Sequence, residues 1–188
     1  KIVHAHGSKV FLDLKYHDIP NTVKGAAKAA TDLGVHIFNV HASGGLEMMK
    51  AALQGIKESK KLKKPKVIAV TMLTSLDKEI MNKQLKLKGK IEYQVLHLAK
   101  LAKKSGLDGI VCSANDLKAI KNKLPKKFMF VTPGIKGPST NAGKDQKRVS
   151  SPKNAIKNGS TILVIGRAIT KAKNRAKAAL EILEDLSK

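Results

Sequence analysis

The stretch that decides the fold is Val10-Phe11-Leu12-Asp13-Leu14-Lys15-Tyr16-His17-Asp18-Ile19-Pro20-Asn21-Thr22. It is an apolar run interrupted by charges, and because side chains alternate faces along a strand, Asp13 and Lys15 share one face. Burying two opposite charges costs several kcal/mol per ion unless each is paired and hydrogen-bonded. Pro20 ends the regular structure and leaves Asp18 at the mouth of the strand. We therefore expect a functional charged cluster in a buried strand, the alternative being a surface strand with a chance ion pair.

Strand-like segments alternate with helical patterns along the whole chain. The six strands are predicted over residues 10–14, 35–40, 67–71, 109–112, 128–132 and 161–165. Helices are predicted over residues 23–33, 46–59, 76–85, 91–104, 116–123 and 152–158, and at the C-terminus around Leu180, Leu183 and Leu186. Strands that are hydrophobic almost throughout indicate a parallel sheet covered by helices. The expected fold class is therefore α/β.

Turn chemistry predicts where several of these helices begin and end. Asn21 or Thr22 is expected to cap the first helix, with Gly34 at its C-terminal stop. Residues 114–116 are expected to cap the fifth helix, and Pro152 suits the first turn of the sixth.

Polar side chains gather at the C-terminal ends of the predicted strands. In a (β/α)8 TIM barrel this end carries the active site, and the loops after the last two strands commonly bind phosphate. Gly166 and Arg167, after the last strand, supply backbone donors and a guanidinium for an anion. The residues at strand ends are Asp13, Lys15, Asp18, His41, Ser43, Thr74, Ser75, Ser113, Thr132, Gly166 and Arg167.

The formal net charge of +23 invites a nucleic-acid interpretation. Against it, only three basic residues are arginines, aromatic residues make up 3% of the chain, and there is no tryptophan for stacking on bases. The lysine-rich runs fall in helical or loop patterns, which favours solvated helix faces. The charge would still steer an anionic small substrate towards the protein.

Length and cysteine content favour one cytoplasmic domain over residues 1–188. The longest apolar runs are far short of the roughly 20 residues that span a membrane, so no membrane association is expected. The single cysteine, Cys112, excludes an internal disulfide and suits a reducing cytosol. Its place in a predicted strand favours a small buried residue over a nucleophile. The histidines show no metal-ligand spacing, and we expect no metal.

Residues 13–22 resemble the D-x-K-x-x-D-I-P-x-T pattern of orotidine 5′-phosphate decarboxylase in its bacterial form. The Asp18-Ile19-Pro20 continuation favours this family over related sugar-phosphate lyases and synthases that share the shorter pattern. The resemblance continues nearly to the end of the chain, through residues 39–45, 70–75, 107–114, 131–135, 145–148 and 164–167.

This resemblance implies decarboxylation of orotidine 5′-phosphate to uridine 5′-phosphate in pyrimidine biosynthesis, without metal or organic cofactor. Lys15 matches the family's proton donor to the carbon-6 carbanion, and Asp13 would keep it charged and oriented. Asp18 matches a residue that, with Ile19 and Thr22, is donated across a two-fold interface into the partner's site. The resemblance therefore implies a homodimer with shared active sites.

The resemblance also implies a set of substrate-binding residues. Thr74 would lie near the pyrimidine, and the phosphate would be held by Gln146, Gly166 and Arg167. Pro133 and Lys136 belong to the same expected site. Binding energy from the remote phosphate could close the loop over residues 136–150 and exclude water.

The chain departs from the family pattern in two ways. Ile135 is usually followed by an arginine, whereas here Lys136 keeps the charge and loses the bidentate fork, and Lys144 is an extra lysine in the loop. A closed barrel needs eight strands, and six are predicted. The resemblance implies that the first two strand–helix units precede Lys1, with an aspartate that contacts the ribose and a lysine that completes the charge network. The alternatives are a truncated, inactive barrel that acts as a cationic nucleic-acid-binding protein, and a related phosphosugar lyase.

Overall fold

The computed structural model describes residues 2–137 and 147–187, and the chain divides into two compact units. The first unit runs to Thr71 and includes His97–Ile110, and the second contains Met72–Leu96 and the chain from Val111 onward. The strands follow the order of the chain, β1 to β6. Among the described residues, no helix is both long and apolar enough to cross a membrane.

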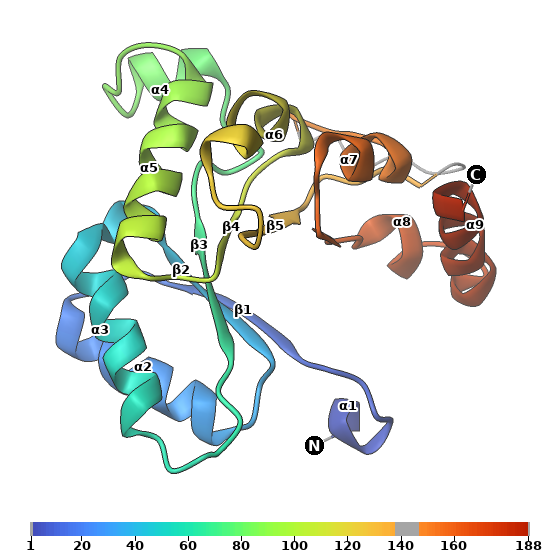
Figure 1. The fold of residues 1–188 in the computed structure, drawn as a ribbon. Coiled ribbons are helices and arrows are strands. Elements are labelled where there is room, and N and C mark those ends of the chain that lie inside the picture. The colour runs from blue at the N-terminus through green and yellow to red at the C-terminus, as the bar shows by residue number, and fades with distance from the viewer. Residues whose placement is uncertain (1, 138–146, 188) are drawn as a thin grey trace. The chain divides into compact units, whose positions relative to one another are not determined.

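The first unit contains three parallel strands and the helices that connect them (Figure 1). Phe38 in β2 pairs with Val67 in β3 and is fully buried. The strands are β1 (Phe11–Tyr16), β2 (Ile37–His41) and β3 (Lys66–Val70), and the helices are α1 (Ile2–Ala5), α2 (Pro20–Asp32), the 3-10 helix η1 (Ala42–Gly44) and α3 (Gly45–Glu58).

Helices α2 and α3 lie side by side, and one glycine permits their close approach (Figure 1). A Cβ atom on Gly55 of α3 would lie 2.1 Å from the carbonyl oxygen of Lys24 in α2. The α2 face buries Val23, Ala27 and Ala30. Small side chains on both helices therefore set the distance between them.

The expected cap of α2 was wrong by a few residues. The helix begins at Pro20 with Ile19 at the N-cap position, and neither Asn21 nor Thr22 caps it. Proline suits the first helical position because its φ is preset and its missing N–H would have no intrahelical partner there. Gly34 ends the helix as expected, with a φ of 75° and a hydrogen bond from its N–H to the Thr31 carbonyl.

Strand β1 departs from the expected buried, regular strand. From Leu12 to Tyr16 it advances further than its partner β2, which moves only from Phe38 to Val40. Residues 13–15 therefore form an irregularity, and the side chain of Leu14 is 58% exposed. The expectation of burial fails here because the extra residues carry Leu14 away from the regular ladder.

The division of the chain into units falls within two elements, α5 (Ile91–Ser105) and β4 (Gly109–Val111), so that each has residues in both units. The rest of the second unit holds parallel strands β5 and β6 and a small core of Ala114, Ile135 and Ala155 packed against Leu163 and Ile165. Its elements are α4 (Lys78–Lys83), α6 (Ala114–Ile120), η2 (Lys121–Lys123), β5 (Met129–Thr132), α7 (Pro152–Asn158), β6 (Ile162–Leu163), α8 (Arg167–Thr170) and α9 (Arg175–Ser187).

Of two predicted helix starts in the second unit, the cap of α6 was wrong and the first residue of α7 is confirmed. Ser113, rather than residues 114–116, caps α6: its hydroxyl accepts from the Asp116 N–H, and the Asp116 carboxylate accepts from the Ser113 N–H. This reciprocal pair is a capping box, in which the third helical residue returns the bond. Helix α7 begins at Pro152 as predicted, with Ser151 as its cap.

Cys112 is buried, as the sequence predicted. It is 1% exposed, and its N–H donates to the Val131 carbonyl. Burial raises the pKa of its thiol well above the ordinary value, and the neighbouring Asp116 carboxylate acts in the same direction. The neutral thiol therefore behaves as a small core side chain.

Candidate active site

The charged pair of residues 13 and 15 is present in the first unit. Lys15 Nζ lies 2.7 Å from Asp13 Oδ1, and the two side chains are 39% and 44% exposed. Asn39, buried in β2, connects them: its Oδ1 accepts from the Lys15 N–H at 2.8 Å, and its Nδ2 donates to Asp13 Oδ1. One buried amide therefore fixes both members of the pair.

The backbone of Lys15 explains why the pair forms at the irregularity. Lys15 has a φ of 50°, in the left-handed region that residues other than glycine rarely adopt. Such a conformation persists where the surroundings hold it in place, and the Asn39 side chain replaces the lost ladder bond. The two side chains meet through this local geometry rather than through the regular strand alternation that we expected.

Asn39 was not among the residues selected from the sequence. It lies within the predicted strand over residues 35–40, where its neighbours Phe38 and Val40 are fully buried. A buried amide needs hydrogen-bond partners, so an isolated asparagine in such a run is a detectable sign of a polar network.

Asp18, Ile19 and Thr22 follow β1 at the start of α2. One oxygen of the Asp18 carboxylate, Oδ1, accepts a hydrogen bond from the Ile19 N–H at 2.7 Å, as is common in turns. All three residues are exposed, and the side chain of Ile19 is 67% exposed.

Two histidines lie next to the charged pair. The ring centroids of His17 and His41 are 5.2 Å apart. Burial lowers the pKa of His41, and the His17 and Lys15 side chains lower it further, against a smaller opposing effect of Asp13. The neutral form of His41 is therefore favoured in the folded protein.

Thr74 lies in the second unit, after β3, and is buried. Its carbonyl accepts from the Lys147 N–H at 3.2 Å, and the Lys147 ammonium pairs with Asp77. Asp77 also caps α4 through the Ile80 N–H. This backbone hydrogen bond and the Lys147 ammonium lower the pKa of Asp77. The segment after residue 146 is thus tied to the segment that carries Thr74.

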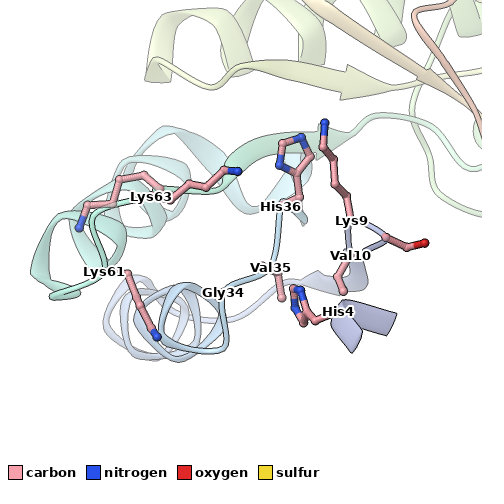
Figure 2. A pocket seen from close by; sticks show the side chains of 10 residues that line it. His4, Lys9, Val10, Gly34, Val35, His36, Lys61 and Lys63 are labelled. Atoms are coloured by element: carbon pink, nitrogen blue, oxygen red, sulfur yellow. The ribbon is translucent and has the colours of Figure 1, made fainter. Parts of the chain in front are cut away.

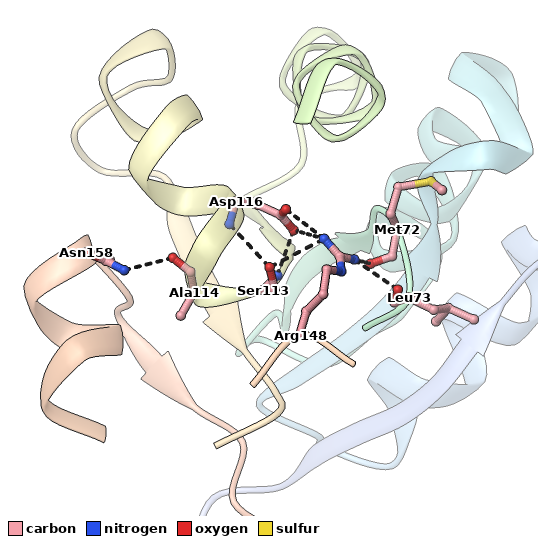
Figure 3. A network of polar contacts seen from close by, with 7 residues as sticks. All are labelled: Met72, Leu73, Ser113, Ala114, Asp116, Arg148 and Asn158. Atoms are coloured by element: carbon pink, nitrogen blue, oxygen red, sulfur yellow. Dashed lines mark hydrogen bonds and ion pairs between the residues drawn. The ribbon is translucent and has the colours of Figure 1, made fainter. Parts of the chain in front are cut away.

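Arg148 is the centre of a network of polar contacts in the second unit (Figure 3). Its Nη1 donates to both oxygens of Asp116 at 2.6 Å, and its Nη2 donates to the carbonyls of Met72 at 3.0 Å and Leu73 at 2.9 Å. The side chains of Arg148 and Asp116 are only 11% and 2% exposed. Arg148 therefore links two segments of the second unit: the one that follows β3, at Met72 and Leu73, and the one that follows β4, at Asp116.

Three expected phosphate or substrate residues line one cavity of the second unit. Pro133, Gly166 and Arg167 surround a space of about 150 Å³, together with residues 134, 135, 164 and 168. Lys136 lies in a separate pocket with Ser150 and Lys118, and its N–H donates to the Ser150 carbonyl. Gln146 lies outside the described residues. The structure thus groups Pro133, Gly166 and Arg167, but not Lys136.

Metal ligation finds no support in the part of the chain that the structure describes. No group of three or more histidine, cysteine, aspartate or glutamate side chains there could hold a metal ion.

The fold and the charged strand ends first define a class, an α/β protein of the TIM-barrel type with polar and charged side chains following its strands. Within that class, residues 1–182 match the family described as Orotidine 5'-phosphate decarboxylase / HUMPS family, and the chain belongs to this family. The fold class and the family expected from residues 13–22 are therefore confirmed.

Named relatives agree with this assignment. Orotidine 5'-phosphate decarboxylase of Bacillus cytotoxicus is 48% identical over 174 residues, which cover 92% of this chain and 73% of the relative. The protein of the same name from Bacillus mycoides is 47% identical with the same coverage. These relatives are thus longer than this chain.

Solved structures give the same result. Orotidine 5'-phosphate decarboxylase from Lactobacillus acidophilus matches all of this chain and 79% of its own length with a TM-score of 0.85 and 38% identity. An uncharacterized conserved protein from Geobacillus kaustophilus matches 98% of this chain and 79% of its own length with a TM-score of 0.83 and 37% identity.

Proposed function

We propose that the chain is a carboxy-lyase that converts orotidine 5′-phosphate to uridine 5′-phosphate in pyrimidine biosynthesis. Its family membership and the names of its relatives support the reaction. The observation that supports the mechanism is the Lys15–Asp13 pair, which Asn39 holds at the end of β1.

In the proposed reaction the bond between pyrimidine carbon 6 and the carboxylate carbon breaks, and carbon dioxide leaves. The electron pair stays on carbon 6 as a vinylic carbanion with little resonance stabilisation. The Lys15 ammonium stabilises this charge and then donates a proton to carbon 6, becoming a neutral amine that takes up a proton before the next turnover. Asp13 orients the ammonium and lies beside the departing carboxylate. No metal or organic cofactor takes part.

The phosphate is proposed to bind at the cavity of Pro133, Gly166 and Arg167. A guanidinium and backbone donors suit the oxygens of a phosphate group, which supports this placement. Thr74 is proposed to contact the pyrimidine, and Gln146 and Lys136 to complete the substrate site.

We further propose a cytoplasmic homodimer in which Asp18, Ile19 and Thr22 enter the partner's site. The exposure of these residues supports this role, because a side chain donated to a second subunit must not be buried within its own. The whole chain is proposed to act as one TIM-barrel-type catalytic domain.

The test is the change in ultraviolet absorbance when orotidine 5′-phosphate is incubated with the protein. Lys15→Ala should abolish turnover while the far-ultraviolet circular dichroism stays unchanged. Lys57→Ala, which removes an exposed lysine of α3, is the matched control and should keep full activity. Normal turnover by Lys15→Ala would exclude Lys15 as the proton donor. Turnover of other phosphosugars but not of orotidine 5′-phosphate would favour a related lyase.

A further inference from the structure

A further cavity lies in the first unit, and none of the charged pair lines it (Figure 2). Its volume is about 270 Å³, and its lining residues come from the segments that precede β1, β2 and β3. Lys15, by contrast, lies near the opposite end of β1. The cavity is therefore at the strand ends that the proposed reaction does not use.

The charged residues that line this cavity are all basic or histidine: His4, Lys9, His36, Lys61, Lys63 and Lys64. Elsewhere in the unit lysines pair with carboxylates, as Lys24 does with Glu58 and Lys66 with Asp108. Within the described residues, the ammonium groups of Lys9 and Lys63 make no salt bridge. The cavity therefore gathers positive charge, which the nearby Asp32 carboxylate offsets only in part, through its interaction with Lys61.

The backbone around the cavity is held in place by the sheet and by one buried serine. The N–H groups of His36 and Ile37 both donate to the Val10 carbonyl, at 2.8 and 3.1 Å, so residues 9 and 36 lie on adjoining segments just before β1 and β2. The Lys9 side chain and the His36 ring extend in the same direction from these strands (Figure 2). The arrangement of these two groups follows from strand pairing.

The lysine-rich loop is anchored separately. Ser59 is buried, and its hydroxyl donates to Asp32 while accepting from the Lys61 N–H. The Lys64 ammonium donates to the Ser59 carbonyl at 2.7 Å. The loop that carries Lys61 and Lys63 is therefore fixed at its start.

The crowding of cations has an effect on His36. Burial lowers its pKa, and the ammonium groups of Lys9, Lys63 and Lys66 lower it further. Cations held together in this way repel one another, and a multivalent anion placed among them would remove that repulsion. Lysine ammonium groups bind phosphate oxygens as point charges with several donors each.

We propose that this cavity is a binding site for a multivalent phosphate anion, such as a diphosphate, either free or as part of a nucleotide. Lysine and histidine side chains line a concave space of about 270 Å³, which suits one compact anion. A nucleic-acid strand would instead require an extended row of positive side chains on the protein that follows the phosphates of the strand. The site is independent of the decarboxylation proposed above.

The experiment measures binding of inorganic pyrophosphate to the whole chain by isothermal titration calorimetry, at constant ionic strength. The double variant Lys9→Gln/Lys63→Gln should weaken binding by at least about tenfold, because each change removes a charge-assisted hydrogen bond. The control double variant Lys57→Gln/Lys103→Gln makes the same change in net charge at exposed positions outside the cavity and should keep the affinity within about twofold. Circular dichroism verifies that both variants fold.

Two further arms separate this site from other anion sites. Arg167→Ala, in the second unit, should leave pyrophosphate binding unchanged, whereas a loss there would mean that pyrophosphate occupies the proposed substrate site and would overturn the inference. A nucleoside diphosphate that binds at least about tenfold more tightly than pyrophosphate, and loses that affinity in Lys9→Gln/Lys63→Gln, would identify a nucleotide as the ligand, while equal affinity would identify the free anion.

Two results would refute the proposal. One is no measurable binding of pyrophosphate, and the other is an equal loss of affinity in the two double variants. An equal loss would indicate a diffuse positive surface in place of a built site.

Discussion

Replacing Arg148 with methionine should destabilise the protein by about 3 kcal/mol, because it leaves a carboxylate buried without its cation. Asp116 is 2% exposed and both of its carboxylate oxygens accept from Nη1, so water cannot replace the lost partner. Removing one member of a buried pair costs roughly 3 to 5 kcal/mol. We expect the lower end of that range because Asp116 keeps the hydrogen bond from the Ser113 N–H.

The assay is urea unfolding followed by circular dichroism at 222 nm, since the chain has no tryptophan to report by fluorescence. The control is Arg175→Met, which removes an exposed arginine at the start of α9 and should change the free energy of unfolding by less than about 0.5 kcal/mol.

If the buried charge of Asp116 causes the loss of stability, the effect of Asp116→Asn should change sign between the two backgrounds. In the natural chain this change removes the partner of Arg148 and should destabilise. In the Arg148→Met background it removes the uncompensated charge, while the asparagine carbonyl can still accept from the Ser113 N–H, so it should stabilise by about 1 kcal/mol or more. A loss of less than about 1 kcal/mol for Arg148→Met, or an equal effect of Asp116→Asn in both backgrounds, would refute this reasoning.

Three more predictions concern the first unit. Asn39→Ala should lower kcat of the proposed reaction by roughly 10- to 100-fold with a smaller effect on KM, because the amide that positions Lys15 is lost; unchanged kcat in steady-state assays would contradict this. The pKa of His41 is lowered in the folded protein, so below pH 6.5 the unfolded chain binds more protons than the folded one. The free energy of unfolding should therefore fall as the pH drops below 6.5, and it should fall less steeply in His41→Gln. Equal pH slopes of the two proteins in urea titrations would contradict this prediction. Gly55→Ala should destabilise by about 1 to 3 kcal/mol because the new Cβ meets the Lys24 carbonyl, and an unchanged urea midpoint would show that α2 and α3 can separate freely.

Much of the fold could be predicted from the sequence because its patterns are local. Apolar runs mark all six described strands within a few residues, and Pro152 places the start of α7 correctly. The start of α2 was missed because two capping residues, Asn21 and Thr22, compete with a proline that suits the first helical position. Leu14 was expected to be buried because an irregularity in β1 leaves no mark in a hydrophobic pattern.

The candidate site was predictable only in part for a different reason. Lys15 and Asp13 are two residues apart, so their pairing could be inferred from local spacing. The Arg148 cluster joins residues distant in the chain, and its partners at Met72 and Leu73 are backbone carbonyls that carry no sequence information. Such contacts depend on tertiary folding.

The buried thiol of Cys112, in the second unit, can report local opening of the structure. Cys112 is the chain's single cysteine and is 1% exposed, so a thiol reagent can modify it only when the surrounding structure opens. The rate of modification in the native protein would therefore report the free energy of that opening, without any label or added residue. Comparing this rate with and without Arg148→Met would show whether loss of the cluster loosens the neighbourhood of β4 or only lowers global stability.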